Sequence, residues 1–352
     1  MSARPTRILF QSHNRQGMGH LMRGLNIARE IIALDPKAEI HFYVKAPPTD
    51  GLFSERFRFL VEPDKTGLTH WPDAVRSLLP DAIVFDTLLP KDPAAEPWLP
   101  SVRYAYVMRK CVEVKQQEVF EHPLIARMDV IVVPHTAEEF GYDLPQGFAS
   151  RTHFVGPIVR ALDPAVQAIL REKYRLQEGD QVIVSTVGGG GDQQTSEIFF
   201  SAVTALHGLI QPRLPRLRHL VVQGPKFRGT VVAADGMTVI ASEPELGNLL
   251  ALAHLVIAEG GYNTANEIRL AKRPAVFLPV ARKYDDPEER VRALERLGLA
   301  FVFPDKMPER IAATILELYN ADGLGKMQGR YREDLMVVGN RAAAKHILET
   351  LR

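Results

Sequence analysis

Cysteine is nearly absent from this chain of 352 residues, in which Cys111 is the only one. A single thiol excludes a disulfide framework and any zinc site built from several cysteines. Long apolar runs are missing too, because the best candidate, Leu249 to Ala258, is interrupted by His254 and falls short of the ~18 residues of a membrane helix. The first apolar stretch, Ile8 to Phe10, is too short for a signal-peptide core. We therefore expect a cytoplasmic protein.

An excess of charge of one sign is also missing. Lys and Arg number 43 and Asp and Glu number 42, which leaves a formal net charge of +1. Dedicated nucleic-acid-binding proteins normally carry a clear basic surplus, so no nucleic-acid partner is expected. No group of His, Cys and carboxylate residues has metal-ligand spacing, and no cofactor is predicted. A Gly-x-Ser-x-Gly elbow is absent, which leaves serine-hydrolase chemistry without support.

The chain does contain short apolar runs that alternate with segments of helical period. The predicted strands are Thr6–Gln11, Glu39–Val44, Ala82–Phe85, Arg103–Val107, Asp129–Val133, Gln181–Thr186, Arg218–Gln223, Met237–Ile240, His254–Ala258 and Ala275–Leu278. The predicted helices are Gly19–Leu34, Asp73–Leu79, Gln116–Arg127, Gln193–His207, Leu246–Leu252, Thr264–Ala271, Glu288–Leu297, Pro308–Tyr319 and Arg341–Leu351. This alternation predicts an α/β protein with two Rossmann-like, doubly wound parallel sheets that face a central cleft.

The boundary between the two predicted domains lies near Val155-Gly156-Pro157, where a strand ends. We expect one domain over residues 1–157 and a second over residues 158–335. Residues 336–352 are predicted to form a helix that packs back on the N-terminal domain. Ligands of such sheets bind at the carboxyl ends of the strands, so motifs that follow strands are the candidate sites.

The first such motif is Gly17-Met18-Gly19-His20-Leu21-Met22-Arg23, which opens a long predicted helix. Gly17 and Gly19 would let the backbone approach a ligand at a helix N-terminus, where free N–H groups point outward. His20 is the right residue type for a general base near neutral pH. The alternative is that both glycines form only a tight turn and that His20 caps or packs. The motif is not a dinucleotide fingerprint, because the third glycine is missing.

The second motif places Gly188, Gly189, Gly190 and Gly191 between a strand and a helix. Four consecutive glycines cost backbone entropy, so a purely structural turn would not need them. We expect them to bring backbone N–H groups to a phosphate or glycosyl group. The motif is not a P-loop, because Asp192 follows where a lysine is required. A flexible linker is the alternative.

The third motif runs from Glu259 to Glu267 and enters a helix. Gly260 and Gly261 would expose N–H groups, while Asn263 or Thr264 is expected to cap the helix. Glu267 is expected to accept two vicinal ribose hydroxyls of a nucleotide whose phosphate lies at the helix start. The alternative is that Thr264-x-x-Glu267 is only a capping box.

The remaining candidates are carboxylates and an apolar segment. Asp86 ends a predicted strand and is an alternative base to His20. The run from Asp285 to Glu289 either contacts sugar hydroxyls or only satisfies the helix macrodipole. The segment Thr87–Leu99 indicates a sizeable acceptor pocket. Its apolar members, which also motivate a hypothesis of membrane contact, are Leu88, Leu89 and Trp98.

The stretch from Glu259 to Ala300 resembles the C-terminal domain of glycosyltransferase family 28. That family is typified by the bacterial N-acetylglucosaminyltransferase that completes the lipid-linked cell-wall disaccharide. The Gly17–Arg23 motif is similar to bacterial predicted glycosyltransferases and to the UDP-sugar hydrolase of the pseudaminic acid pathway. The resemblance covers both halves in outline and is specific at the two motifs that contain Gly17 and Gly260.

The resemblance implies a metal-independent GT-B fold whose second domain holds the nucleotide-sugar. It assigns Gly188–Gly191 and Gly260-Gly261 to the diphosphate and Glu267 to the ribose. It places Glu289 where relatives often carry a glutamine that touches the donor sugar, and His20 where the cleft histidine lies. The sequence departs from the pattern at Glu259, where many transferases have histidine and where a carboxylate would repel a diphosphate.

Three functional hypotheses follow. The leading one is an inverting glycosyltransferase that moves a sugar from a nucleoside-diphosphate sugar, expected to be a UDP-sugar, to a hydroxyl of a small-molecule or lipid-linked acceptor. The second keeps the fold but uses water, giving a nucleotide-sugar hydrolase. The third is a nucleotide-sugar-binding protein without turnover. A lipid-linked acceptor would bring the protein to the inner face of the membrane.

Overall fold

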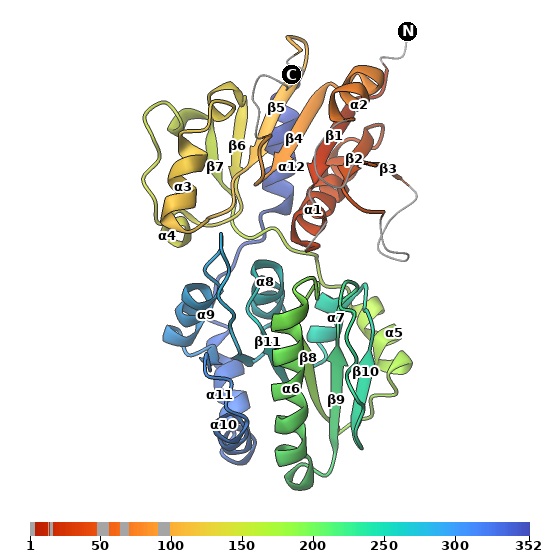
Figure 1. Cartoon of the computed structure of the whole chain (residues 1–352), viewed down its shortest axis with the longest axis vertical. Helices are drawn as coiled ribbons and strands as arrows, with labels where there is room; N and C mark the ends of the chain where they lie inside the picture. The colour runs from red at the N-terminus through yellow and green to blue at the C-terminus, as the bar shows by residue number, and fades with distance from the viewer. Residues whose placement is uncertain (1–3, 13, 15–16, 48–55, 64–69, 91–98) are drawn as a thin grey trace. The chain divides into compact units, whose positions relative to one another are not determined.

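The computed structural model describes residues 4–12, 14, 17–47, 56–63, 70–90 and 99–352. They divide into two compact units, and each is an α/β unit with its own sheet (Figure 1). The first unit combines Met1–Val159 with Val337–Arg352, and the second is Arg160–Met336. Trp98 and most of the predicted acceptor segment lie outside the described residues.

The first unit contains a seven-stranded parallel sheet in the order β3-β2-β1-β4-β5-β6-β7. Its strands are β1 (Arg7–Ser12), β2 (Glu39–Val44), β3 (Phe57–Val61), β4 (Ala82–Asp86), β5 (Arg103–Val107), β6 (Val130–Val133) and β7 (Thr152–Phe154). Its helices are α1 (Gly19–Leu34), α2 (Trp71–Leu78), α3 (Glu113–Phe120), α4 (Ala137–Phe140) and α12 (Asn340–Glu349). The order reverses between β1 and β4, which makes that pair the topological switch point.

Both faces of the first sheet are buried, which explains why its strands are apolar runs without alternation. On one face, α1 and α12 pack side by side over residues such as Phe10 and Val84. On the other face, Trp71 of α2 and Phe140 of α4 belong to a core that includes Phe85. The C-terminal helix is therefore a structural part of the first unit.

The second unit contains a six-stranded parallel sheet in the order β10-β9-β8-β11-β12-β13. Its strands are β8 (Gln181–Thr186), β9 (Leu217–Val222), β10 (Met237–Ile240), β11 (Leu255–Ala258), β12 (Ala275–Phe277) and β13 (Ala300–Val302). Its helices are α5 (Pro164–Lys173), α6 (Gln193–Ile210), α7 (Leu246–Leu250), α8 (Tyr262–Ala271), α9 (Pro287–Arg296), α10 (Pro308–Asn320) and α11 (Gly323–Arg330). Here the order reverses between β8 and β11.

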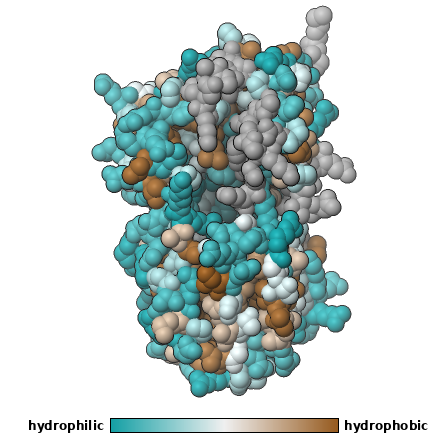
Figure 2. Space-filling view, in the orientation of Figure 1, coloured by the Kyte–Doolittle hydropathy of each residue, from teal (hydrophilic) through white to brown (hydrophobic). Residues whose placement is uncertain are grey.

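Two apolar cores lie on opposite faces of the second sheet. Residues of α7, α8 and α9, including Ile268, form one core with residues of β11 and β12 such as Phe277. Residues of α6 and α10, including Phe199 and Ile311, form the other. Exposed large apolar side chains belong to several different elements, and on the visible face brown residues are scattered among teal ones (Figure 2). Scattered exposure of this kind is normal for a protein surface.

The sequence prediction differs from the structure at several elements. The predicted helix Gln116–Arg127 is wrong in extent, because α3 ends at Phe120 and a separate 3-10 turn covers Ile125–Arg127. Pro123 explains the break, since the residue before a proline is pushed out of the helical region. The elements missing from the prediction are the short strands β3 and β13 and the helices α4, α5 and α11, whereas β7 is the strand expected to end near Val155.

Two structural observations bear on the expected membrane contact. None of the helices in the described part of the chain is long and apolar enough to cross a membrane. Leu88 is 36% exposed, whereas Leu89 is partly buried and packs against the core of the first unit.

Replacement of Ile347 by alanine tests the role of α12. Ile347 is fully buried in the core shared with α1, so Ile347→Ala should lower the free energy of unfolding of the first unit by about 2–5 kcal/mol. Both tryptophans of the chain, Trp71 and Trp98, fall within the first unit, so denaturation followed by tryptophan fluorescence reports on that unit. Lys345→Ala on the exposed face of α12 is the control, with an expected change within about 0.5 kcal/mol. An equal effect of the two changes would contradict the assigned packing.

Candidate active site

All the predicted site residues except Glu289 lie at the two switch points. In the first unit, β1 is followed by the Gly17–Arg23 motif, and its neighbour β4 ends at Asp86. In the second unit, β8 is followed by Gly188–Gly191, and its neighbour β11 is followed by Glu259–Glu267. Residues after adjacent parallel strands emerge at the same edge of the sheet, on either side of the point where the strand order reverses. Each unit therefore has one candidate half-site.

In the first unit, three side chains form a buried polar cluster. His20 and Arg23 lie one turn apart on α1 and face the same side of the helix. His20 Nδ1 is 2.7 Å from Asp86 Oδ1, and Arg23 Nε donates to Asp86 Oδ2 at 2.9 Å. The second guanidinium nitrogen of Arg23 donates to Asp86 Oδ1 and, at 3.0 Å, to the Thr87 hydroxyl. Both oxygens of Asp86 are thus held by partners from α1.

Burial and charge set the protonation states in this cluster. Burial by itself raises the pKa of Asp86, but the Arg23 guanidinium and the hydrogen bond from His20 outweigh it and hold the pKa at about 2. Burial lowers the pKa of His20, and the nearby Asp86 offsets this effect only in part. At neutral pH the cluster therefore contains an ionised Asp86, a cationic Arg23 and a neutral His20.

The hydrogen bond to Asp86 also selects the tautomer of His20. An ionised carboxylate can only accept, so Nδ1 of the neutral ring must carry the proton. An Arg23 nitrogen lies 3.3 Å from Nδ1, and the shorter contact with the carboxylate decides the assignment. The lone pair is then on Nε2. The His20 side chain is 24% exposed, whereas those of Asp86 and Arg23 are 1–2% exposed, so His20 is the member that a substrate can reach.

The backbone around Asp86 is fixed by unusual local geometry. Thr87 adopts a φ of +60°, in the left-handed region that side chains other than glycine rarely occupy. Its carbonyl accepts a 2.8 Å hydrogen bond from the buried Tyr106 hydroxyl, and its own hydroxyl donates to Asp86 Oδ1 at 3.0 Å. Strain of this kind persists only where surrounding contacts hold it, and it is common at functional sites.

Gly17 precedes this cluster and has open surroundings among the described residues. A Cβ atom built at Gly17 would meet no described residue within 4 Å, and its φ lies outside the left-handed region. Gly24 of α1 differs, because a Cβ there would lie 3.1 Å from the Phe42 ring. Close packing against the described residues therefore does not require the glycine at position 17.

In the second unit, the loop Gly188–Gly191 is pinned against its neighbours. Gly188 and Gly190 both have positive φ, and a Cβ at Gly190 would lie 2.7 Å from the Gln223 carbonyl. Gln193 Nε2 donates to the carbonyls of Gly190 and Lys226, at 3.0 and 2.9 Å. These contacts contradict the flexible-linker alternative. They also correct the expectation that a structural turn would not need these glycines, because close packing requires at least two of them.

The same loop lies beside the N-terminus of α8. A Cβ at Gly188 would come within 3.0 Å of Thr264 Oγ1, so the two glycine motifs lie side by side. The helix N-cap is Gly261, and no side-chain cap is found there among the described residues. Asn263 and Thr264 lie inside the first turn, so neither caps the helix as predicted, and the capping-box alternative for Glu267 is wrong. The positive end of the α8 dipole therefore lies beside this loop.

Lys226 is a cation of this half-site that the sequence prediction missed. It follows β9, and its backbone N–H donates to the Gly189 carbonyl at 3.1 Å. Its ammonium nitrogen is buried and has no hydrogen-bond partner in the described part of the chain. Burial lowers the pKa of this amine to about 8. A lysine between a proline and a phenylalanine gives little signal in sequence, because only the fold brings it to the glycine loop.

Glu267 is a partly buried carboxylate one turn into α8. Its Cγ and Cδ atoms lie 3.7 and 3.8 Å from the position of a Cβ on Gly247. No other described residue hydrogen-bonds to its side chain. Burial raises its pKa to about 7, and the charge of Arg160 reduces that rise. A carboxylate that the fold leaves without donors can accept hydrogen bonds from ligand hydroxyls.

Glu259 is paired within the second unit. The residue is 3% exposed, and its Oε2 accepts a 3.0 Å hydrogen bond from Arg282. Burial raises the pKa of Glu259 to about 7, against the opposing effect of Arg282. The raised pKa reduces the fraction of Glu259 that is ionised, and the Arg282 cation balances the charge that remains. The repulsion of a diphosphate that the sequence suggested is correspondingly weaker.

The carboxylates at the start of α9 have local partners. Asp286 caps the helix by accepting from the Glu289 N–H at 2.9 Å, as the macrodipole alternative expects. Glu289 is exposed and its side chain pairs with Arg296 at 2.9 Å. Arg290 donates to the Gly260 carbonyl at 3.0 Å and thereby ties α9 to the third motif. The structure does not bring Glu289 to the loop residues described above.

A buried chain of hydrogen bonds joins Ser185, His219 and His207. His207 Nε2 is 2.9 Å from the Asp235 carbonyl and must donate, which makes its Nδ1 an acceptor. His219 Nδ1, at 3.1 Å, is then the donor, and His219 Nε2 accepts from Ser185 Oγ at 2.7 Å. Ser185 and His219 are fully buried. Substrate cannot reach this Ser–His pair, so it is a structural network.

No family model matches the chain. Over 185 residues the chain is 30% identical to the UDP-N-acetylglucosamine–N-acetylmuramyl-(pentapeptide) pyrophosphoryl-undecaprenol N-acetylglucosamine transferase of Methylorubrum extorquens, a match that covers 49% of this chain and 48% of the relative. The chain spans about half the length of such curated relatives. These relatives carry the name that the resemblance to family 28 suggested.

Solved structures match nearly the whole chain. The spinosyn forosaminyltransferase SpnP aligns with a TM-score of 0.67 at 14% identity, over 98% of this chain and 99% of SpnP. A UGT transferase from Siraitia grosvenorii in complex with UDP aligns with a TM-score of 0.63 at 14% identity, over the same shares of the two chains. The fold is therefore GT-B, with two parallel-sheet α/β domains, as predicted.

Replacement of Arg23 tests the charge balance of the first half-site. Arg23→Met would leave Asp86 buried without its main cation, so the free energy of unfolding of the first unit should fall by about 3–5 kcal/mol at pH 7. The pKa of Asp86 is lower in the folded protein than its ordinary value of 3.8, so its ionised form stabilises the fold at pH values above 3.8. The loss of stability caused by Arg23→Met should therefore shrink as the pH falls towards 2. Denaturation curves followed by tryptophan fluorescence measure both effects. Arg76→Met, which breaks an exposed pair with Asp73, should cost under about 1 kcal/mol. A pH-independent deficit would contradict the assignment.

Proposed function

We propose that this protein is an inverting glycosyltransferase that moves a sugar from a UDP-sugar to an acceptor hydroxyl. The observation that carries the proposal is the neutral His20, held by ionised Asp86 with its Nε2 lone pair available. In the described residues no serine or cysteine side chain is hydrogen-bonded to His20, and we assign a substrate hydroxyl as its proton donor. Asp86 is buried and fully paired, which favours His20 over Asp86 as the base. The UDP-sugar class is supported by the names of the curated relatives.

The reaction follows from these protonation states. The acceptor O–H gives its proton to His20 Nε2 while its oxygen attacks the anomeric carbon. The bond from that carbon to the phosphate oxygen breaks, and UDP leaves with the electron pair. The resulting imidazolium is stabilised by the Asp86 carboxylate, and Arg23 and Thr87 hold that carboxylate in place. Asp86, Arg23 and Thr87 act as positioning residues.

The second half-site would hold the leaving nucleotide. The positive end of the α8 dipole and the buried Lys226 ammonium would supply positive charge for the diphosphate. Gly261 has an open environment, since a Cβ there would meet nothing within 4 Å, and it would let phosphate oxygens approach the backbone. Glu267 would accept the ribose hydroxyls. These groups would stabilise the developing charge without a metal ion.

The proposed acceptor is a hydroxyl compound, either lipid-linked or a small molecule. The curated relatives are named for a lipid-linked acceptor, and SpnP is named for spinosyn, a small molecule. A lipid-linked acceptor would place the protein at the inner surface of the membrane.

Replacement of His20 tests the proposed base. His20→Ala should leave UDP affinity unchanged and lower kcat about 10²–10⁴-fold, because only the proton transfer is lost. The measurement is product formation from labelled UDP-N-acetylglucosamine and UDP-glucose with a cell extract as the acceptor source, with and without EDTA. His122→Ala, which also lies in the first unit, is the control.

The outcomes separate the three hypotheses. Sugar transfer that survives EDTA and requires His20 supports the proposal. Release of free sugar in place of transfer would indicate the hydrolase. Tight UDP binding without any turnover would indicate a binding protein, and activity that EDTA abolishes would contradict charge stabilisation by the chain alone.

Calorimetric titration with UDP tests the second half-site. Glu267→Ala should weaken binding by about 1.5–3 kcal/mol, because a charge-assisted hydrogen bond to the ribose is lost. The pKa of Glu267 near 7 means that the carboxylate gains charge as the pH rises, so wild-type affinity for uridine, which has no phosphate for Lys226 to contact, should increase from pH 6 to pH 8. Lys226→Met should weaken binding of UDP more than that of uridine, since it removes a phosphate contact.

Glu309→Ala on the exposed face of α10 serves as the control for charge. Equal affinity for UDP in Glu267→Ala and wild type would contradict the ribose assignment. Failure of wild type to bind UDP, GDP, dTDP, CDP or ADP would overturn the nucleotide-sugar proposal as a whole.

A further inference from the structure

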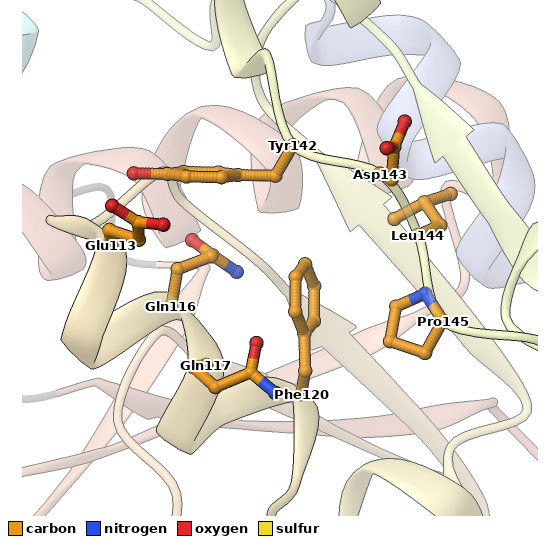
Figure 3. A pocket seen from close by; sticks show the side chains of 8 residues that line it. All are labelled: Glu113, Gln116, Gln117, Phe120, Tyr142, Asp143, Leu144 and Pro145. Atoms are coloured by element: carbon orange, nitrogen blue, oxygen red, sulfur yellow. The ribbon is translucent and has the colours of Figure 1, made fainter.

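A pocket of about 320 Å³ opens in the first unit between α3 and the segment Tyr142–Pro145 (Figure 3). Its polar lining includes Glu113 and Gln116, and its apolar walls include Phe120 and the Tyr142 ring. Ligand pockets range from about 300 to 1,000 Å³, so this one suits a single small ring. The segment that follows β5 lies next to it, because the Cys111 N–H donates to Gln116 Oε1 at 3.1 Å.

Gln116 provides the observation that points to a ligand. The residue is 1% exposed, and its Oε1 is occupied by the Cys111 N–H. Its Nε2 is buried and has no partner in the part of the chain that the structure describes. Figure 3 shows the amide extending towards the space between the Tyr142 and Phe120 rings. A buried donor without an acceptor is costly, so a bound group with a lone pair would relieve it.

Glu113 supplies the complementary chemistry at the mouth of the pocket. Its exposed carboxylate has no hydrogen bond or ion pair with any described residue, and Figure 3 places it on the side of the Tyr142 hydroxyl. That hydroxyl is itself fixed, because it donates to the Cys111 carbonyl at 3.0 Å. The pocket thus presents a free buried donor on Gln116 and acceptor-only carboxylates on Glu113 and Asp143.

This pairing selects among ligand classes. An ammonium group could satisfy Glu113 but would leave the Gln116 donor without an acceptor. A carboxylate or phosphate could satisfy Gln116 but would be repelled by Glu113. A hydroxyl both donates and accepts, so two neighbouring hydroxyls satisfy both side chains at once. The aromatic walls and Pro145 would pack on the C–H face of a ring that carries such hydroxyls.

We propose that this pocket is a binding site for a neutral sugar ring, held by hydroxyl hydrogen bonds to Glu113 and Gln116 Nε2 and by packing on Phe120 and Tyr142. The proposal goes beyond the transfer reaction, because it requires neither UDP nor His20. In a glycosyltransferase, such a site would let a substrate that already carries a sugar be held through that sugar.

Saturation-transfer difference NMR on the full chain tests the site with methyl β-D-glucopyranoside and its N-acetylglucosamine analogue as probes. Wild type should show difference signals for the ring protons, and excess UDP should not remove them. Glu113→Gln should abolish or greatly weaken these signals, since the acceptor-only group on the helix of Gln116 is lost. Glu118→Gln, on an exposed position of the same helix, is the matched control and should keep them.

A second variant, Gln116→Met, removes the buried donor at nearly constant length. Because it also removes the acceptor for the Cys111 N–H, its fold is checked by thermal denaturation, and Glu113→Gln decides the test if it fails to fold. Absence of sugar signals in wild type would overturn the proposal. Signals that persist in both folded variants, or that UDP displaces, would also overturn it. Binding of butylammonium or butyrate in preference to the glycosides would overturn the ligand class. UDP titration of the same variants reports separately on the proposed transfer reaction.

Discussion

The reversal of strand order in each parallel sheet is the constraint on which the candidate chemistry depends. Between β1 and β4, and again between β8 and β11, the chain leaves neighbouring strands in opposite directions, so the ends of those strands are not covered by a crossover. His20 and Asp86 come from the two sides of the first reversal, 66 residues apart in sequence, and still lie 2.7 Å apart. The loop at Gly188 and the start of α8 come from the two sides of the second.

The two half-sites differ in whether the fold supplies hydrogen-bond partners for their buried charges. In the first, both oxygens of Asp86 have hydrogen-bond partners, so the fold alone satisfies the cluster. The protonation states of its members are therefore set before a substrate binds. In the second, Glu267 and the Lys226 ammonium lack hydrogen-bond partners among the described residues. Both of their pKa values move towards neutrality because burial disfavours the charged forms. A preorganised base and a binding site completed by its ligand are expected to differ in this way.

Glycine has two separate uses in this chain, and the sequence alone does not distinguish them. Gly190 and Gly260 have positive φ and lie so close to Gln223 and Val291 that a side chain would collide. Gly17 and Gly261 have ordinary φ, and no described residue lies within 4 Å of where their Cβ atoms would be, so packing against the described residues would tolerate alanine there. A glycine that the packing does not require is the better indicator that a ligand approaches the backbone closely.

The sequence determined the class of fold, because buried parallel strands are apolar runs and the helices between them have a clear period. It also located the glycine motifs and His20, since residues that follow strands mark the ligand edge of such sheets. It missed β3 and β13, because short edge strands bury too little to leave a pattern. Only the tertiary structure decided the roles of Arg23 and Lys226, the capping of α8 by Gly261 and the pairing of Glu259 with Arg282. Burial and partners set the pKa and the availability of each group, and both are properties of residues distant in sequence that folding brings together.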